Sequence, residues 1–183
     1  GRIILSPGKF NLVLHRLANQ IIENYDDFEN ACIVGIQEKG VTLSNHLIDI
    51  MKTELPAKTE IQFGKLDISF YRDDYRLREK PIKVSPTELD FSLVGKRVLL
   101  IDDVLYSGRT IQAALSALQD FGRPAKVDLL VMVDRRFNRE LPIHPDYVGV
   151  TVDAVDEAYV RVSWDDAKNK HKVQIFSADK DKV

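Results

Sequence analysis

Two adjacent aspartates and a Ser-Gly pair lie close together in the stretch VLLIDDVLYSGRT, residues 98–110. Asp102 and Asp103 follow an apolar run, and carboxylates accept hydrogen bonds well from the vicinal hydroxyl groups of a sugar. Two like charges side by side are costly unless a ligand or a cation uses them, and Mg²⁺ tolerates such a pair. The acid pair therefore predicts a site for a hydroxylated ligand.

The residues after the acid pair predict a phosphate site. Ser107 and Gly108 precede a helical segment, and the amino terminus of a helix offers unpaired backbone N–H groups and a positive dipole end. Gly108 permits a tight turn, while the hydroxyl groups of Ser107 and Thr110 add donors. A simple hydroxyl N-cap would also explain a Ser-Gly-x-Thr string. Its combination with the acid pair favours a sugar phosphate such as ribose 5-phosphate.

Other patterns of functional residues are missing from the sequence. No G-x-x-x-x-G-K-[ST] string occurs, which excludes a P-loop, and GIQEKG (residues 35–40) lacks the G-x-G-x-x-G spacing of a dinucleotide site. No G-x-S-x-G string marks a hydrolase nucleophile. His46 and His171 have no neighbours along the chain at the spacing of metal ligands, so the sequence predicts no protein-bound metal site.

The elements that must position these residues alternate between helix and strand. Ser6-Pro7 predicts the start of the first helix, as an N-cap followed by proline. Periodicity and short apolar runs predict three helices, at residues 8–24, 42–55 and 108–121, and four strands, at residues 31–36, 60–71, 97–102 and 126–133. Three short alternating strands follow residue 146. The alternation indicates an α/β fold with a mostly parallel sheet flanked by helices, and ligands bind such sheets beyond the carboxyl ends of the strands.

Composition places limits on the class of protein. The chain has 183 residues, of which 44% are hydrophobic and 30% charged, and a net charge of −2. These values predict one domain, residues 1–183, without the global charge of a nucleic-acid-binding protein. The single Cys32 forms no internal disulfide, which favours a reducing, cytoplasmic location. No apolar run reaches the ~18 residues of a membrane span.

A long polar segment between the predicted strands is a candidate lid. Residues 72–90 contain Pro81 and Pro86, show no periodicity, and have five basic residues against five acidic ones. A loop of this length inside a compact domain is usually functional. We therefore expect it to close over the ligand.

The stretch 98–110 resembles the phosphoribosyl-diphosphate-binding motif of type I phosphoribosyltransferases. YSGRT, VDRRFNRELPIHPDYVG and LDISFYRDD resemble, more specifically, the bifunctional pyrimidine operon attenuation regulator/uracil phosphoribosyltransferase family. With GIQEKG, the similarity runs from about residue 3 to 150. The resemblance implies a type I phosphoribosyltransferase fold with a flexible hood. It also implies a homodimer or higher oligomer that makes UMP from uracil and phosphoribosyl diphosphate (PRPP) with Mg²⁺.

The resemblance also implies roles for individual residues, with Asp102, Asp103, Lys39 and Arg72 as catalytic groups. The implied binding residues are Asp102 and Asp103 for the ribose hydroxyls; Tyr106, Ser107, Gly108, Arg109 and Thr110 for the 5-phosphate; Glu38, Lys39 and Gly40 for pyrophosphate; Arg72, Asp73 and Asp74 in the hood; and Val133, Asp134 and Arg135 beside the base. The family's pyrophosphate loop usually has Thr-Arg-Gly, where this chain has Glu-Lys-Gly. Lysine retains the charge of arginine but not its fork geometry.

Base preference and RNA binding leave alternatives open. Purine enzymes of the hypoxanthine type have an aspartate where this chain has Tyr106, which favours a pyrimidine; orotate or a purine is the alternative base. The family's RNA-binding face corresponds to five residues here, of which the first, third and fifth differ from the usual pattern: His15, Arg16, Asn19, Arg139 and His144. The second functional hypothesis is an RNA-binding regulator that senses UMP, with weak or no catalysis.

Overall fold

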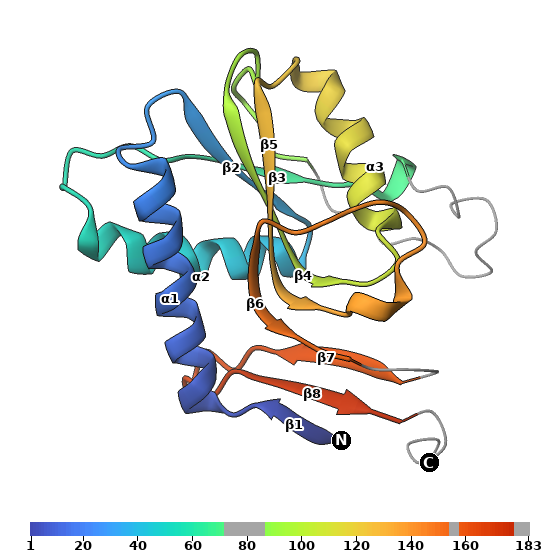
Figure 1. Ribbon diagram of the computed structural model, residues 1–183. Helices are drawn as coiled ribbons and strands as arrows, with labels where there is room; N and C mark the ends of the chain where they lie inside the picture. The colour runs from blue at the N-terminus through green and yellow to red at the C-terminus, as the bar shows by residue number, and fades with distance from the viewer. Residues whose placement is uncertain (72–86, 154–157, 178–183) are drawn as a thin grey trace.

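Five parallel strands form a central sheet in the computed structural model, which describes residues 1–71, 87–153 and 158–177 (Figure 1). In spatial order the strands are β3 (Gln62–Leu66), β2 (Ala31–Ile36), β4 (Arg97–Leu105), β5 (Lys126–Asp134) and β6 (Tyr147–Thr151). Every residue of β2 is buried, as expected for a parallel strand covered on both faces. The predicted α/β fold with a parallel sheet is thereby confirmed.

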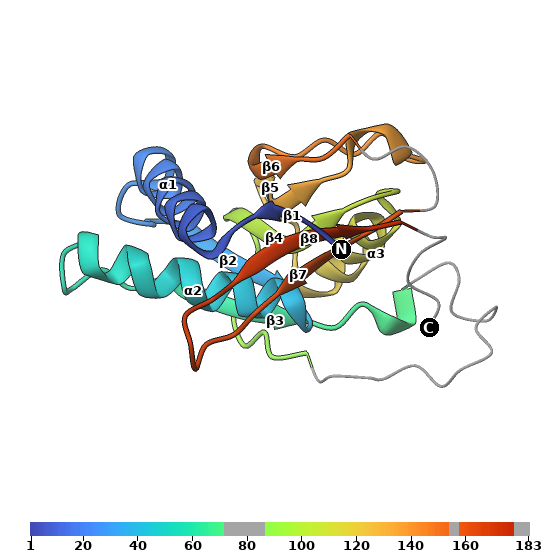
Figure 2. The same ribbon diagram turned by 90° about the horizontal axis from the view of Figure 1, so that it is seen from below.

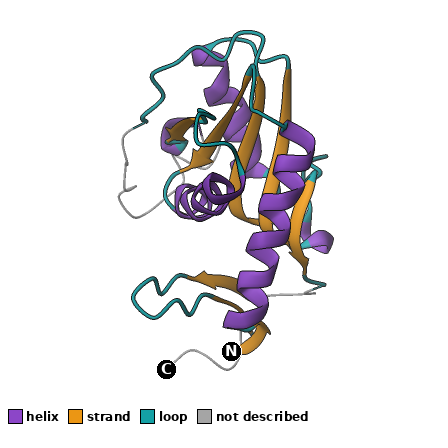
Figure 3. Ribbon diagram, turned by 90° about the vertical axis from the view of Figure 1, so that its left-hand side faces the viewer, coloured by secondary structure: helices purple, strands orange, loops and turns teal. Residues whose placement is uncertain are grey.

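Helices cover both faces of the sheet (Figures 1 and 3). On one face α1 (Pro7–Tyr25) and α2 (Lys39–Glu54) pack with Leu99 and Ile101 of β4 in one hydrophobic cluster. On the other face α3 (Arg109–Leu118) packs with Val98 and Leu100 in a second cluster. Alternate residues of β4 thus pack on opposite faces of the sheet, which is why residues 98–101 are all apolar.

A second, antiparallel sheet contains β1 (Arg2–Leu5), β8 (Lys172–Phe176) and β7 (Tyr159–Ser163) in that order. It lies beyond the carboxyl ends of the central strands, as Figures 1 and 2 show. A hydrogen bond of 2.7 Å from the guanidinium of Arg135, which follows β5, to the carbonyl of Ala158, which precedes β7, connects the two sheets. The sequence analysis did not identify β1, because four residues give too short a pattern.

Two element boundaries differ from the prediction in ways that affect the site. Strand β4 continues to Leu105, past the predicted end at residue 102, because the apolar Val104 and Leu105 keep pairing with β5. The two aspartates therefore lie inside the strand. Helix α2 begins at Lys39, three residues before the predicted start. The predicted strand 31–36 occurs with the same bounds, as β2. The other predicted elements occur with shifted ends; strand 60–71 is shorter, and the helix of 108–121 ends in a 3-10 turn, Gln119–Phe121.

The chain changes direction across the sheet between β2 and β4. From β2 the chain passes through α2 to β3 on one side, whereas β4 lies on the other side of β2 and leads to β5 and β6. Such a switch point, at the carboxyl ends of the strands, is where open α/β sheets bind ligands. Among the described residues, no helix is both long and apolar enough to cross a membrane.

Candidate active site

Asp102 and Asp103 are a buried carboxylate pair at this switch point, 8% and 7% exposed. Asp102 Oδ1 accepts a hydrogen bond of 2.8 Å from the N–H of Asp103, and Asp103 Oδ1 accepts one of 2.8 Å from the N–H of Val104. Burial, and then the charge of Asp103, raise the pKa of Asp102 well above its usual range. Burial also raises the pKa of Asp103, although Lys39 opposes this shift. A cation or several hydroxyl donors would relieve the electrostatic cost of the pair.

The start of α2 lies directly against the acid pair. Lys39 is the first residue of the helix, and its Nζ is 3.9 Å from Asp103 Oδ2. A Cβ atom on Gly40 would lie 2.3 Å from the carbonyl oxygen of Ile101 and 3.1 Å from the Cα of Asp102. Only glycine permits this approach, so Gly40 sets the distance between the helix and β4. Glu38 precedes the helix at the N-cap position.

The start of α3 forms the second half of the site. Gly108 is the N-cap, with φ of 95°, a left-handed conformation that favours glycine. Ser107 Oγ accepts a hydrogen bond of 3.3 Å from the N–H of Arg109, and no acidic residue lies in the first helical turn, which includes Thr110. The ten-residue helix therefore directs its positive end toward the loop, as an anion site requires.

Residues 139–141 form hydrogen bonds with the phosphate loop, which we define as residues 106–110. The carbonyl of Ser107 accepts hydrogen bonds of 2.9 and 3.1 Å from the N–H groups of Glu140 and Leu141. Arg139 donates from Nη1 to the carbonyl of Tyr106 and from Nη2 to Asp134 Oδ1, both at 2.7 Å. Nothing in the sequence indicated this contact, because about thirty residues separate the partners.

The end of β5 provides the third wall. Val133 and Asp134 are buried at its last two positions, and Arg135 follows. The guanidinium of Arg135 lies 4.2 Å from the centre of the Tyr106 ring, a cation–π contact. Burial lowers the pKa of Arg135, and its Nε has no hydrogen-bond partner among the described residues. Arg135 and Tyr106 thus form a polar and aromatic surface beside the phosphate loop.

The predicted catalytic and substrate-binding residues that the structure describes lie at the carboxyl ends of β2, β4 and β5 or in the segments that follow these strands. Arg72, Asp73 and Asp74 of the predicted hood lie outside the described residues. Near the other end of the hood, the backbone of Glu88 exchanges two hydrogen bonds of 2.8 Å with that of Lys65.

The residues expected to contact RNA do not form one free basic face. His15, Asn19 and His144 are exposed, but the guanidinium of Arg16 donates to the carbonyls of Val148 and Gly149 of β6, at 2.6 Å in the closer case. The side chain of Arg139 is 18% exposed and is directed inward. RNA contact by these residues stays a prediction.

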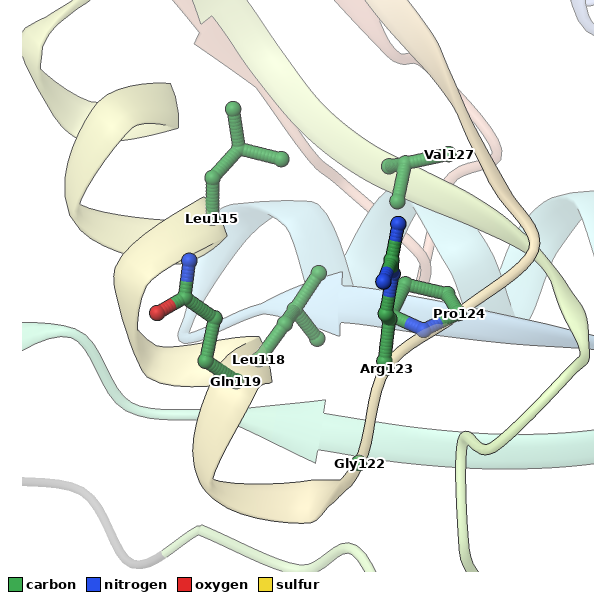
Figure 4. Close-up of a pocket in the computed structure, with 7 residues that line it drawn as sticks. All are labelled: Leu115, Leu118, Gln119, Gly122, Arg123, Pro124 and Val127. Carbon is green, nitrogen blue, oxygen red and sulfur yellow. The ribbon is translucent and has the colours of Figure 1, made fainter.

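A hollow of about 390 Å³ lies at the end of the sheet opposite to the acid pair and is a poor alternative site (Figure 4). Leu115 and Leu118 of α3 face Arg123, Pro124 and Val127 across it. Val127 belongs to the start of β5, so the hollow lies at the amino ends of the strands. Parallel sheets bind ligands at the carboxyl ends of their strands, where the acid pair lies.

Comparisons with known proteins identify the family of the chain. The phosphoribosyl transferase domain family matches residues 4–167. Curated proteins named "Bifunctional protein PyrR" are similar over nearly the whole chain. The protein from Synechocystis is 41% identical over 94% of this chain and 95% of its own, and that from Caldicellulosiruptor saccharolyticus 38% identical over 97% and 96%.

Solved structures share the fold at low identity. A hypoxanthine phosphoribosyltransferase from Trypanosoma cruzi has a TM-score of 0.68 at 16% identity, covering 94% of this chain and 95% of its own. One from Staphylococcus aureus has a TM-score of 0.65 at 21% identity, covering 87% and 81%. The predicted type I phosphoribosyltransferase fold is thereby confirmed. The chain belongs to the phosphoribosyl transferase domain family, and within it to the group of the bifunctional PyrR proteins.

Proposed function

We propose that this phosphoribosyltransferase transfers the phosphoribosyl group of PRPP to uracil, giving UMP and pyrophosphate. The observation that carries the proposal is the buried pair Asp102-Asp103, placed between the starts of α2 and α3. A protein retains such a costly pair where a ligand compensates it. The bifunctional PyrR relatives support a pyrimidine as the acceptor.

In the proposed reaction the bond from ribose C1 to the pyrophosphate oxygen breaks, and a bond from C1 to uracil N1 forms. The N1 proton of uracil leaves, and pyrophosphate carries away the electron pair of the broken bond. Asp102 and Asp103 accept hydrogen bonds from the ribose hydroxyls, while backbone N–H groups at the start of α3 hold the 5-phosphate. Lys39 faces the leaving pyrophosphate, and closure of the predicted hood excludes water.

Mg²⁺ is the cation that we expect to enter with PRPP. The donor set fits it, because the two carboxylates are hard oxygen ligands with raised pKa values and only Lys39 as an ion-pair partner among the described residues. Bound Mg²⁺ would supply charge neutralisation for pyrophosphate. Asp102 and Asp103 are the residues that would hold its hydration shell or the ion itself.

Tyr106 and Arg135 are the proposed base-recognition residues, next to Val133 and Asp134. Uracil presents carbonyl oxygens, and the guanidinium of Arg135 is a donor with an unused N–H at Nε among the described contacts. The Tyr106 ring offers a stacking surface that is nearly half exposed. An aspartate, as in purine enzymes, is absent from this position in the loop.

Release of pyrophosphate from PRPP, measured base by base, tests the proposal. We expect turnover with uracil and Mg²⁺, and none with orotate, hypoxanthine, guanine or no base. Turnover with hypoxanthine alone would refute the choice of base while leaving phosphoribosyl transfer intact. No turnover with any base, while UMP still binds, would instead leave a nucleotide-sensing regulator.

Arg139 should matter for transfer through its two inward hydrogen bonds. We expect Arg139→Ala to lower kcat/KM for PRPP by about 10–100-fold, because it removes charge-assisted bonds to Asp134 and to the Tyr106 carbonyl. Arg139→Lys should recover little, since one ammonium cannot replace the fork. Added guanidinium ion should restore part of the loss in Arg139→Ala.

Arg136→Ala is the matched control for Arg139. Arg136 pairs with Asp153 at 2.6 Å on the surface, and we expect its removal to leave kcat/KM nearly unchanged. Equal activity in the two variants, with equal melting temperatures, would refute the positioning role of Arg139.

A second function, RNA-binding regulation that responds to UMP, is supported by one contact. The segment that follows Arg139 belongs to the loop of the expected RNA face, and it donates two backbone hydrogen bonds to Ser107 of the phosphate loop. A nucleotide bound at the phosphate loop could therefore change the conformation of the RNA-binding loop through these two hydrogen bonds. Gel-shift assays with pyrimidine operon leader RNA, with and without UMP, test the proposal; His144→Ala should weaken RNA binding without changing phosphoribosyl transfer.

We also propose a homodimer or higher oligomer, which sedimentation would test.

A further inference from the structure

His46, Asp166 and His171 lie close together in space, although His46 is far from the other two in the sequence. His46 Nε2 lies 3.0 Å from Asp166 Oδ1, and His171 Nε2 lies 3.8 Å from the same oxygen. All three potential ligand atoms lie within 4.8 Å of one another. The sequence prediction of no metal-ligand neighbours counted only positions along the chain. It missed that α2 packs beside the turn between β7 and β8.

Aromatic packing holds the two imidazole rings in place. His46, on α2, stacks on the Trp164 ring at a centroid distance of 4.6 Å, and its centroid is 4.8 Å from that of His171. His171 is 2% exposed and also contacts Phe10 of α1, at 5.5 Å. The side chain of Asp166, in contrast, is 70% exposed in the turn. The imidazole nitrogens of His46 and His171 are thus held by packing, whereas the carboxylate of Asp166 is free to change rotamer.

We propose that His46, Asp166 and His171 bind one divalent transition-metal ion of the zinc class. Two imidazole nitrogens and a carboxylate oxygen are a set that such ions accept, with a fourth position left open. Ligand atoms around a tetrahedral zinc ion lie roughly 3.3 Å apart. The carboxylate oxygen lies 3.0 and 3.8 Å from the two nitrogens, on either side of that value. Metal binding requires all three atoms, which lie within 4.8 Å of one another, to move to about this spacing.

The protonation of His171 is compatible with a ligand role. A metal ligand must be a neutral imidazole. Without metal, Nδ1 accepts a hydrogen bond of 3.2 Å from the N–H of Asp165, so Nε2 carries the proton in the neutral ring. Metal at Nε2 requires the other tautomer, in which Nδ1 donates. Metal-bound histidines usually donate this second N–H to a carboxylate, a carbonyl or water.

A hollow of about 350 Å³ adjoins the three residues and gives access to the open position. It lies between α1, α2 and the β7–β8 turn, and both histidines line it. Its other polar lining residues are Asn11, His15, Asp49, Thr53 and Asn169. Water or a small ligand can therefore occupy the fourth position, while the ion itself ties the β7–β8 turn to α2.

Zinc binding by the full-length, untagged, chelator-stripped protein tests the proposal, with a chromophoric chelator as competitor. We expect one Zn²⁺ per chain, a rise in melting temperature, and a visible absorption band with Co²⁺ typical of a tetrahedral site. His46→Ala and Asp166→Asn should each weaken Zn²⁺ binding by at least about ten-fold. Both residues are partly exposed, so the variants should fold, whereas the buried His171 is a less suitable target.

Two of the four histidines of the chain provide controls. His144 lies in the loop before β6, and His15 lines the hollow but is not one of the three proposed ligands. His144→Ala and His15→Ala should therefore bind Zn²⁺ like the wild type. Mg²⁺ should not compete, which separates this site from the acid pair. Undetectable Zn²⁺ binding, or equal binding by wild type and His46→Ala, would overturn the proposal and leave a hydrogen-bonded cluster.

Discussion

Asp102→Asn is expected to remove most of the transferase activity and at the same time to stabilise the fold. The change keeps the shape of the side chain but removes a charge that is buried and lies beside Asp103. We expect kcat/KM to fall at least about 100-fold, as for loss of a group that stabilises charge in the transition state. The free energy of unfolding at pH 7 should rise by on the order of 1–2 kcal/mol. Denaturant titration and pyrophosphate release measure the two effects.

The pH dependence of stability provides a second measurement of the same effect. Because the pKa of Asp102 is higher in the folded than in the unfolded protein, the folded state binds more protons just above the unfolded value of 3.8. Its contribution to stability therefore falls as pH rises through the window that starts there. In Asp102→Asn this loss should disappear. Equal slopes of stability against pH in wild type and variant would contradict the assignment.

Asp128→Asn is the matched control, because folding lowers the pKa of Asp128 whereas it raises that of Asp102. Burial alone would raise the pKa of Asp128, but hydrogen bonds from Tyr25 and Arg97 outweigh it and lower this pKa. The stability that Asp128 contributes is present above the unfolded pKa and lost as pH falls through the folded one. We expect Asp128→Asn to destabilise the protein at neutral pH. Both side chains are nearly inaccessible to solvent, but Asp128 accepts side-chain hydrogen bonds from Tyr25 and Arg97, whereas Asp102 lies beside a second carboxylate.

Gly40→Ala should disrupt the site by displacing α2 from β4. The added Cβ would lie 2.3 Å from the Ile101 carbonyl oxygen, a backbone atom that cannot move alone. We expect a loss of about 1–3 kcal/mol in the free energy of unfolding. Because Lys39 moves with the helix, kcat/KM should fall roughly 100-fold, as for a displacement of about 1 Å in a catalytic group.

Gly8→Ala is the control for the effect of a methyl group itself. Gly8 lies in the first turn of α1, and a Cβ there meets nothing within 4 Å. Alanine should raise stability by up to about 1 kcal/mol, because it reduces the freedom of the unfolded chain. If Gly40→Ala kept full activity, the start of α2 would not be what positions Lys39.

Local sequence patterns were sufficient for the fold and for much of the candidate site. Apolar runs such as ACIVGI predicted buried parallel strands. The acid pair with its Ser-Gly turn predicted a ligand site, and the structure places these residues at the switch point of the sheet. Each of these signals lies within a few residues along the chain. The end of β4 was predicted too early because the charges of Asp102 and Asp103 suggested exposure, whereas both carboxylates are buried.

Most of the contacts that the sequence could not predict join distant segments. Arg139 was assigned to an RNA face because it is a cation in a polar loop, yet its partners are Asp134 and the Tyr106 carbonyl. The close approach of Gly40 to Ile101 depends on how α2 lies on the sheet. The meeting of His46 with Asp166 and His171 likewise requires the tertiary structure.

The pairing of β1 with β8 constrains the order in which the chain folds during synthesis. Strands β2 to β6 and their helices can assemble while the last part of the chain is still in the ribosome, since their partners have already emerged. Strand β1 emerges first but has its partner among the last described residues. The small sheet should therefore form later than the central one, after β8 has left the ribosome. Until then β1 has unpaired backbone N–H and C=O groups that other chains can bind, and we expect chaperones to protect it.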